Sequence, residues 1–90
     1  MLIDFIAENK SKLDINMLDE LSKRFSGDEI VDALDSVIKM EYLTLDSLRR
    51  NNVLDMNSDE LKLLADSFSV HANLIDNLFK VRNEFVEKYL

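Results

Sequence analysis

His71 is the only histidine of the chain and the first residue to consider for catalysis, because an imidazole can act as a general base near neutral pH. Ser67 precedes it by four residues, so the two would share one face of a helix. A nucleophilic serine also needs a group that orients the base, and the helical neighbours Phe68 and Ile75 offer none. We therefore expect no catalytic site, and interpret His71 as a partly buried imidazole that bonds to a neighbour or sets the register of a helix pair.

Asp55, Asn57 and Asp59 are spaced like the first ligands of a calcium loop. Glu60 stands at the sixth position, where such a loop needs glycine, and Asp66 stands at the twelfth in place of a bidentate glutamate. The chain contains no cysteine and one glycine, which excludes thiolate chemistry, a zinc knuckle and a glycine-rich phosphate loop. We expect no metal, no cofactor, no small-molecule substrate and no enzymatic activity.

Carboxylates gather on one predicted helix, at Asp28, Glu29, Asp32 and Asp35. The formal charge of the chain is −7, and an acidic surface is repelled by nucleic acid and by anionic membranes. This face is an ordinary solvated helix surface, or it imitates the phosphate spacing of a nucleic acid, or it binds a basic surface. We include its four carboxylates among the candidate partner-binding residues.

The last third of the chain carries an apolar stripe from Leu61 to Tyr89 at spacings of three and four residues, which predicts an amphipathic helix. Such a helix would be roughly 45 Å long, whereas a compact 90-residue domain has a radius of gyration of about 12 Å. One domain can hardly cover the whole stripe, so we expect part of it to contact a second copy or another protein. The residues expected at that contact are Phe68, His71, Ile75, Arg82, Phe85 and Tyr89.

Arg82 interrupts this stripe, and its helical neighbours Phe79 and Phe85 cannot pair with it. Its stem could pack on the apolar surface while the guanidinium reaches water. Alternatively, the guanidinium pairs with a carboxylate on another subunit or partner.

The scarcity of glycine and the absence of proline favour a mainly α-helical fold, and 90 residues make one domain, 1–90. We expect four or five helices. A short helix opens at Leu2, a second begins at Asp14 or Asn16, a third begins with a capping box of Ser26 and Glu29 and ends near Met40, and a long helix spans 58–90 after Asn57.

Residues 42–56 allow two interpretations. Tyr42–Leu45 and Val53–Met56 alternate like two strands, with Arg49, Arg50, Asn51 and Asn52 as the turn of a short β-wing. Alternatively, Thr44 caps a short helix with Leu45 and Leu48 facing inward.

Residues 14–56 resemble a winged helix-turn-helix domain, with 14–25 as the first helix, Asp28–Met40 as the second and 42–56 as the wing. The resemblance implies a dimeric DNA-binding regulator whose long last helix dimerises. Lys23, Arg24, Arg49 and Arg50 would then form its basic patch. The second helix departs from the family pattern, because four carboxylates in the major groove would repel phosphate.

No apolar run approaches the roughly 20 residues that span a bilayer, and the first residues lack the basic region of a signal peptide. We expect a cytoplasmic protein, in the host cytoplasm if it is viral, that does not bind membranes. Its expected function is that of a small acidic interaction or regulatory protein that forms a homodimer and binds a protein partner. A viral or mobile-element inhibitor, an antitoxin-like binder and an assembly chaperone all fit; a winged-helix transcriptional regulator is the alternative.

Overall fold

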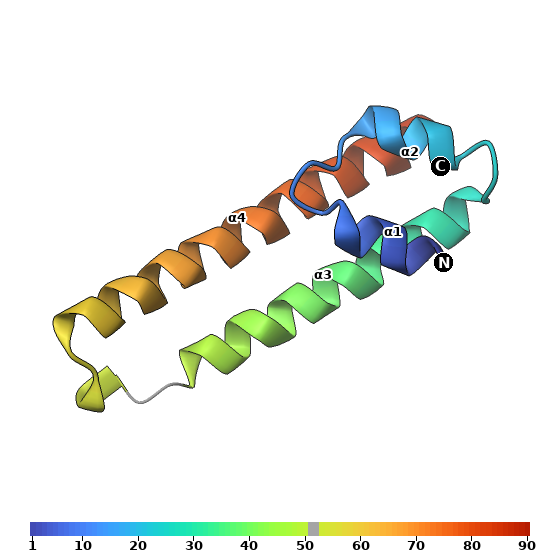
Figure 1. The fold of residues 1–90 in the computed structure, drawn as a ribbon. Helices are drawn as coiled ribbons and strands as arrows, with labels where there is room; N and C mark the ends of the chain where they lie inside the picture. Colours follow the sequence, from blue (N-terminus) through green and yellow to red (C-terminus); the bar gives the residue numbers. More distant parts are fainter. Residues whose placement is uncertain (51–52) are drawn as a thin grey trace.

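Two long helices run side by side in opposite directions, and two short helices pack at one end of the pair (Figure 1). The computed structural model describes residues 1–50 and 53–90. Their elements, in chain order, are α1 (Leu2–Glu8), α2 (Ile15–Leu21), α3 (Gly27–Arg49), a 3-10 turn (Val53–Asp55) and α4 (Ser58–Tyr89). The described residues include no strand, so the expected mainly α-helical fold is confirmed.

Three of the helices begin at the side-chain caps that the sequence predicts. Ser26 and Glu29 form a reciprocal capping box at the start of α3, with 3.2 Å from the Glu29 amide to the Ser26 hydroxyl. Asn57 accepts a hydrogen bond from the amide of Glu60 at 2.9 Å and starts α4. Asp14 caps α2 in the same way. Each cap satisfies one amide that the helix itself leaves unpaired.

Among the residues that the structure describes, the hydrophobic core lies at the end of the molecule where the short helices pack. α1 packs against α3, α2 packs against α4, and the two long helices contact each other. The side chains with the least exposure come from all four helices and from the segment between α1 and α2. They are Ile6, Leu13, Leu18, Ile30, Leu34, Val37, Leu78 and Phe85.

α3 continues past Met40, where the sequence analysis ends the third helix, and reaches Arg49. Thr44 does not cap a separate helix: its hydroxyl donates to the carbonyl of Met40 at 3.1 Å, inside the continuous helix. Leu45 and Leu48 are half-buried, because they extend the apolar spacing of α3 toward α4. The predicted end of the third helix was therefore wrong by about two and a half turns.

The alternative of a β-wing over residues 42–56 does not match the described part of that segment. Residues 42–49 are helical and 53–55 form the 3-10 turn. Asn51 and Asn52, expected in the turn of the wing, lie outside the described residues. The resemblance of residues 14–41 to a helix-turn-helix stays a prediction.

Candidate protein-interaction surface

Glu41 on α3 and His71 on α4 mark the place along the long-helix pair where the core ends. Among residues 42–50 and 54–74, which we call the distal hairpin, none is buried. Large apolar side chains in it are strongly exposed, including Tyr42 and Leu43 at 50% and 60%. Helices in proteins are stabilised chiefly by packing of an apolar face, and this pair packs only against itself. The distal hairpin is therefore the first candidate for a binding surface.

A groove runs between the two long helices on one face of the molecule. Two adjoining hollows of about 290 Å³ each form it, and Tyr42 and Leu45 line both. The ring of Phe79 meets that of Tyr42 edge to face, with centroids 6.3 Å apart. We call this the hairpin groove; it is lined by Tyr42, Leu45, Asp46, Arg49, Phe68, Ala72, Ile75, Asp76 and Phe79.

The hairpin groove faces away from α1 and α2. On α3, Ala33 lines a hollow with the first residues of α1, and Tyr42 follows Ala33 by nine residues, or about two and a half turns. On α4, the amide of Asn77 donates to the carbonyl of Leu13 between α1 and α2, and Phe68 precedes Asn77 by the same nine residues. Residues two and a half turns apart lie on opposite sides of a helix. Tyr42 and Phe68 therefore point away from the short helices, which leave the groove uncovered.

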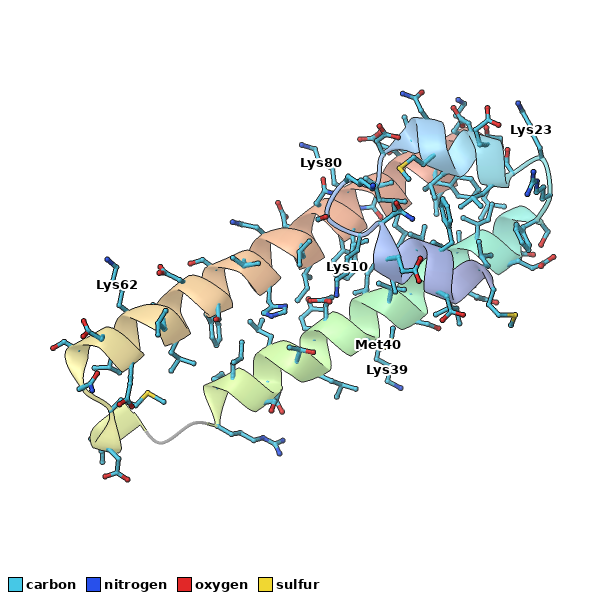
Figure 2. The ribbon with its side chains drawn as sticks, viewed as in Figure 1. Lys10, Lys23, Lys39, Met40, Lys62 and Lys80 are labelled. Atoms are coloured by element: carbon cyan, nitrogen blue, oxygen red, sulfur yellow. The ribbon has the colours of Figure 1, made fainter. Side chains whose placement is uncertain are left out.

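A buried carboxylate holds the two long helices together where the distal hairpin begins. Glu41 is 3% exposed and pairs with Lys10, which lies in the segment between α1 and α2 (Figure 2). His71 Nδ1 lies 2.7 Å from the other carboxylate oxygen. Burial raises the pKa of Glu41, but the hydrogen bonds from Lys10 and His71 outweigh it and leave the pKa below its ordinary value. This cluster was not predicted from the sequence, although a glutamate at core spacing on α3 indicates it.

The same geometry bears on Ser67 and His71 as a catalytic pair. Glu41 orients the imidazole, which is the role of the third group that the sequence did not reveal. Lys10 shares that carboxylate, however, and Ser67 makes no hydrogen bond among the described side chains. The contacts of His71 match the predicted partly buried imidazole that bonds to a neighbour.

The predicted acidic site is divided between two environments. Asp28, Glu29 and Asp32 are exposed in the first turns of α3, at the end of the molecule remote from the distal hairpin. Glu29 is engaged in the capping box. Asp35 pairs with Arg82 across the two long helices, so the guanidinium expected to reach another subunit has a carboxylate within its own chain.

The residues expected along the stripe of α4 also divide. Phe85 is fully buried in the core of its own chain, which corrects its expected contact with a partner. Ile75 is 6% exposed and lines the hairpin groove. Phe68 is half-buried and lines the hairpin groove, where a partner can reach it. The sequence pattern placed all three on one stripe, and only the packing of α1 and α2 separated buried from accessible positions.

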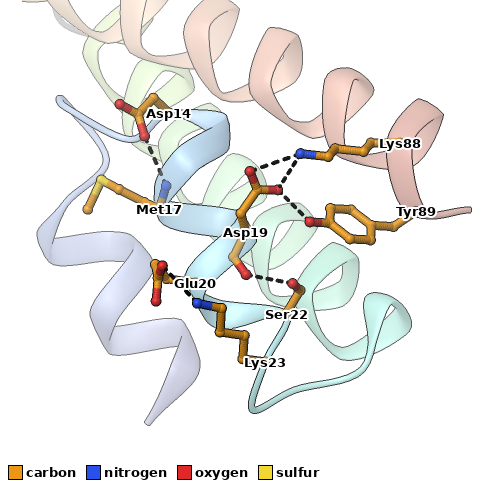
Figure 3. Close-up of polar contacts among 8 residues, drawn as sticks. All are labelled: Asp14, Met17, Asp19, Glu20, Ser22, Lys23, Lys88 and Tyr89. Atoms are coloured by element: carbon orange, nitrogen blue, oxygen red, sulfur yellow. Dashed lines mark hydrogen bonds and ion pairs between the residues drawn. The ribbon is translucent and has the colours of Figure 1, made fainter.

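Tyr89, also expected at the contact with a partner, instead binds α2 of its own chain from the end of α4. Its hydroxyl donates to Asp19, and the ammonium of Lys88 donates to both oxygens of the same carboxylate at 3.0 and 2.9 Å (Figure 3). These contacts lower the pKa of Asp19, first through the Tyr89 hydroxyl and then through Lys88. The three side chains act as a clamp between distant parts of the sequence.

The four basic residues of the DNA-binding alternative do not form one patch. Lys23 and Arg24 precede α3, whereas Arg49 and Arg50 end it, about 33 Å away along 23 helical residues. Both arginines pair with Asp46 at the far tip of α3. The four basic side chains therefore do not combine into one DNA-binding site.

The carboxylates that imitate a calcium loop lie mostly on one continuous helix. Asp59, Glu60 and Asp66 belong to α4, which holds them along an axis in place of a loop that folds around an ion. Within residues 1–50 and 53–90, no group of three or more histidine, aspartate or glutamate residues is placed to hold a metal ion.

None of the helices in the described part of the chain combines the length and apolar character that crossing a membrane requires. No protein-family model, no curated protein and no solved structure matches this chain. A function therefore has to be argued from the surface itself.

Proposed function

We propose that this chain is a non-enzymatic interaction protein that regulates a protein partner by binding it through the hairpin groove. The observation that carries the proposal is the distal hairpin, whose apolar side chains lie at helical spacing while none of its described residues is buried. Exposed apolar patches of this kind on a small domain mark binding surfaces. Inhibitors, antitoxin-like binders and assembly chaperones act in this way.

The chemistry of the groove favours an amphipathic helix as the bound element. Phe68, Tyr42 and Phe79 provide apolar and aromatic area between two parallel rims, which suits a helix lying lengthwise with anchors at successive turns. The rims carry both signs of charge, with Arg49 on one helix and Asp76 on the other. They would orient a bound helix, while the central aromatic side chains would supply most of the affinity.

A photo-crosslinking residue at the groove provides the test. Benzoylphenylalanine replaces Tyr42 in one variant and Leu63 in a matched control, since Leu63 is nine residues from Ala72 and lies on the opposite side of α4. We expect one protein to crosslink from position 42 and not from position 63 in cells of the source.

The captured protein is then purified and titrated calorimetrically with the unmodified chain, Phe68→Glu and Leu63→Glu. We expect Phe68→Glu to weaken binding at least about tenfold, because it places a charge in the apolar groove, and Leu63→Glu to change it less than about threefold. Equal losses in both variants, or none in either, would overturn the groove as the binding surface.

A DNA-binding regulator without the expected wing is the second candidate, favoured by the exposure of Arg49 and Arg50, whose side chains are 75% and 80% accessible at the tip of α3. It predicts salt-dependent binding to duplex DNA that the double change Arg49→Ala/Arg50→Ala weakens. Fluorescence anisotropy with a labelled duplex at two salt concentrations tests it, and affinity unchanged by the double substitution would count against it.

A further inference from the structure

We propose that a second copy of this chain occupies the hairpin groove, so that two distal hairpins pack antiparallel as a four-helix bundle. The inference rests on the proposed function of the groove as a protein-binding surface and names the partner. Its grounds are the surface area of the chain, the self-complementary shape of the distal hairpin and the distribution of charge.

The accessible surface of the chain exceeds that of a compact monomer by the amount that one side of a dimer buries. The chain exposes 6193 Å², whereas a compact protein of 10.5 kDa exposes about 5,400 Å². The excess of about 800 Å² equals the area that each partner contributes to a standard protein interface. The radius of gyration is 15.6 Å, against about 12 Å for a compact chain of this length. The excess surface area therefore comes from the elongated shape of the helix pair.

The shape of the distal hairpin suits a copy of itself. It is a layer of two antiparallel helices with an apolar groove between them, and a second such layer completes a four-helix arrangement that buries both grooves. A two-fold axis through the groove places Tyr42 and Phe68 of each copy against the same surface of the other. Aromatic side chains of this kind are enriched at protein interfaces.

Charge selects the antiparallel orientation over the parallel one. Residues 42–74 carry five acidic and three basic residues, whereas the rest of the chain carries thirteen acidic and eight basic, a formal charge of −5. A parallel dimer would set two such ends side by side. An antiparallel dimer joined by the distal hairpins sends these ends in opposite directions along molecules 50 Å long, well beyond the screening length of about 8 Å at physiological salt.

Sedimentation equilibrium of the purified chain at 1–100 µM tests the second copy. We expect a mass of about 21 kDa, twice the 10.5 kDa of the chain. Phe68→Glu should raise the dissociation constant at least about tenfold, and Leu63→Glu, on the other side of α4, should leave it within about threefold. Circular dichroism of both variants establishes that they remain helical.

Spin labels test the orientation independently of these variants, because the chain has no cysteine of its own. A nitroxide on Asp59→Cys, in the first turn of α4, should show an intermolecular distance on the order of 25 Å or more, since the two tips lie at opposite ends of the bundle. A distance below about 15 Å would put the tips together and overturn the antiparallel dimer.

Amide hydrogen exchange separates the failure of this inference from that of the proposed function. A monomer at 100 µM whose distal hairpin exchanges rapidly would overturn the second copy and leave the groove open to a different protein. A monomer in which residues 42–50 and 54–74 exchange slowly would overturn both, because the helix pair would then need no partner.

Discussion

Glu41 holds His71 across the interface of α3 and α4, with 2.7 Å between the carboxylate oxygen and the ring Nδ1. The lowered pKa of Glu41 keeps it ionised at neutral pH, and an ionised carboxylate only accepts hydrogen bonds, so Nδ1 carries the proton that it donates. Lys10 donates to the other oxygen. One side chain thus joins three segments at the place where the core ends.

Replacing Glu41 with glutamine should lower the free energy of unfolding by about 1–3 kcal/mol, because the buried charge is lost and the new NH2 group, a donor, replaces one of the two oxygens that Lys10 and His71 contact. Urea denaturation followed by circular dichroism at pH 7 measures it. Glu20→Gln is the matched control: its carboxylate pairs with Lys23 on the surface of α2, and its loss should cost less than about 0.5 kcal/mol. Equal effects of the two changes would refute the role of the cluster.

The same carboxylate should make stability depend on acidity. The pKa of Glu41 is lower in the folded chain than its ordinary value of 4.5, so the unfolded chain binds more protons between the two values. Its stabilising contribution is complete above about pH 4.5 and is lost as the pH falls through the folded pKa. We expect the stability difference between the wild-type chain and Glu41→Gln to shrink below pH 4.5. A difference that stays constant from pH 6 to pH 3 would contradict this account.

The clamp formed by Asp19, Lys88 and Tyr89 should protect the end of α4 from local opening. In Asp19→Asn the charge that Lys88 and Tyr89 both contact is removed, so amides in residues 85–90 and 15–21 should exchange faster. Hydrogen exchange by mass spectrometry measures it, with Glu20→Gln as a control on the same helix. If exchange in both segments is unchanged, the clamp does not stabilise the end of α4.

Two phenylalanines of α4 differ in burial, one lying in the core and the other lining the hairpin groove. Phe85 is fully buried, and Phe85→Ala should cost about 3–5 kcal/mol through lost burial and a residual cavity. Phe79 is 37% exposed and contacts Tyr42, so Phe79→Ala should cost only about 0.5–1.5 kcal/mol. Both are measured by denaturation at one protein concentration, since a dimer would stabilise the folded state. Similar costs would mean that the two positions are equally buried.

Gly27 is the one glycine of the chain and stands at the start of α3, where it has no positive φ. A Cβ added there would lie 3.0 Å from the tip of the Leu90 side chain, which is 65% exposed and free to shift. Gly27→Ala should therefore stabilise the chain by about 0.4–1 kcal/mol, chiefly by restricting the unfolded state. Thermal unfolding tests the sign, and a lower midpoint would mean that Leu90 cannot move.

Local signals in the sequence predicted the helix starts well. Ser26, Glu29 and Asn57 need only neighbouring backbone amides to act as caps, and all three side chains accept from such an amide. Glu60 instead accepts from the side-chain amide of Asn57. The end of α3 was misplaced because residues after Met40 alternate apolar and polar side chains over too short a stretch to separate strand from helix. In the structure these residues continue α3 to Arg49, and Leu45 and Leu48 are half-buried on it.

The sequence by itself determined that this chain forms amphipathic helices with an apolar stripe on the last one, because periodicity and capping act within a few residues. Only the tertiary structure decided which part of that stripe is covered. Phe85 and Phe68 both belong to the stripe, yet one is in the core and the other lines the groove. This difference arises because α1 and α2 pack at only one end of the long-helix pair. The pairing of Glu41 with His71, which lie 30 residues apart, likewise depends on the tertiary structure. Contacts of such separation depend on chain topology, which spacing along one helix does not encode.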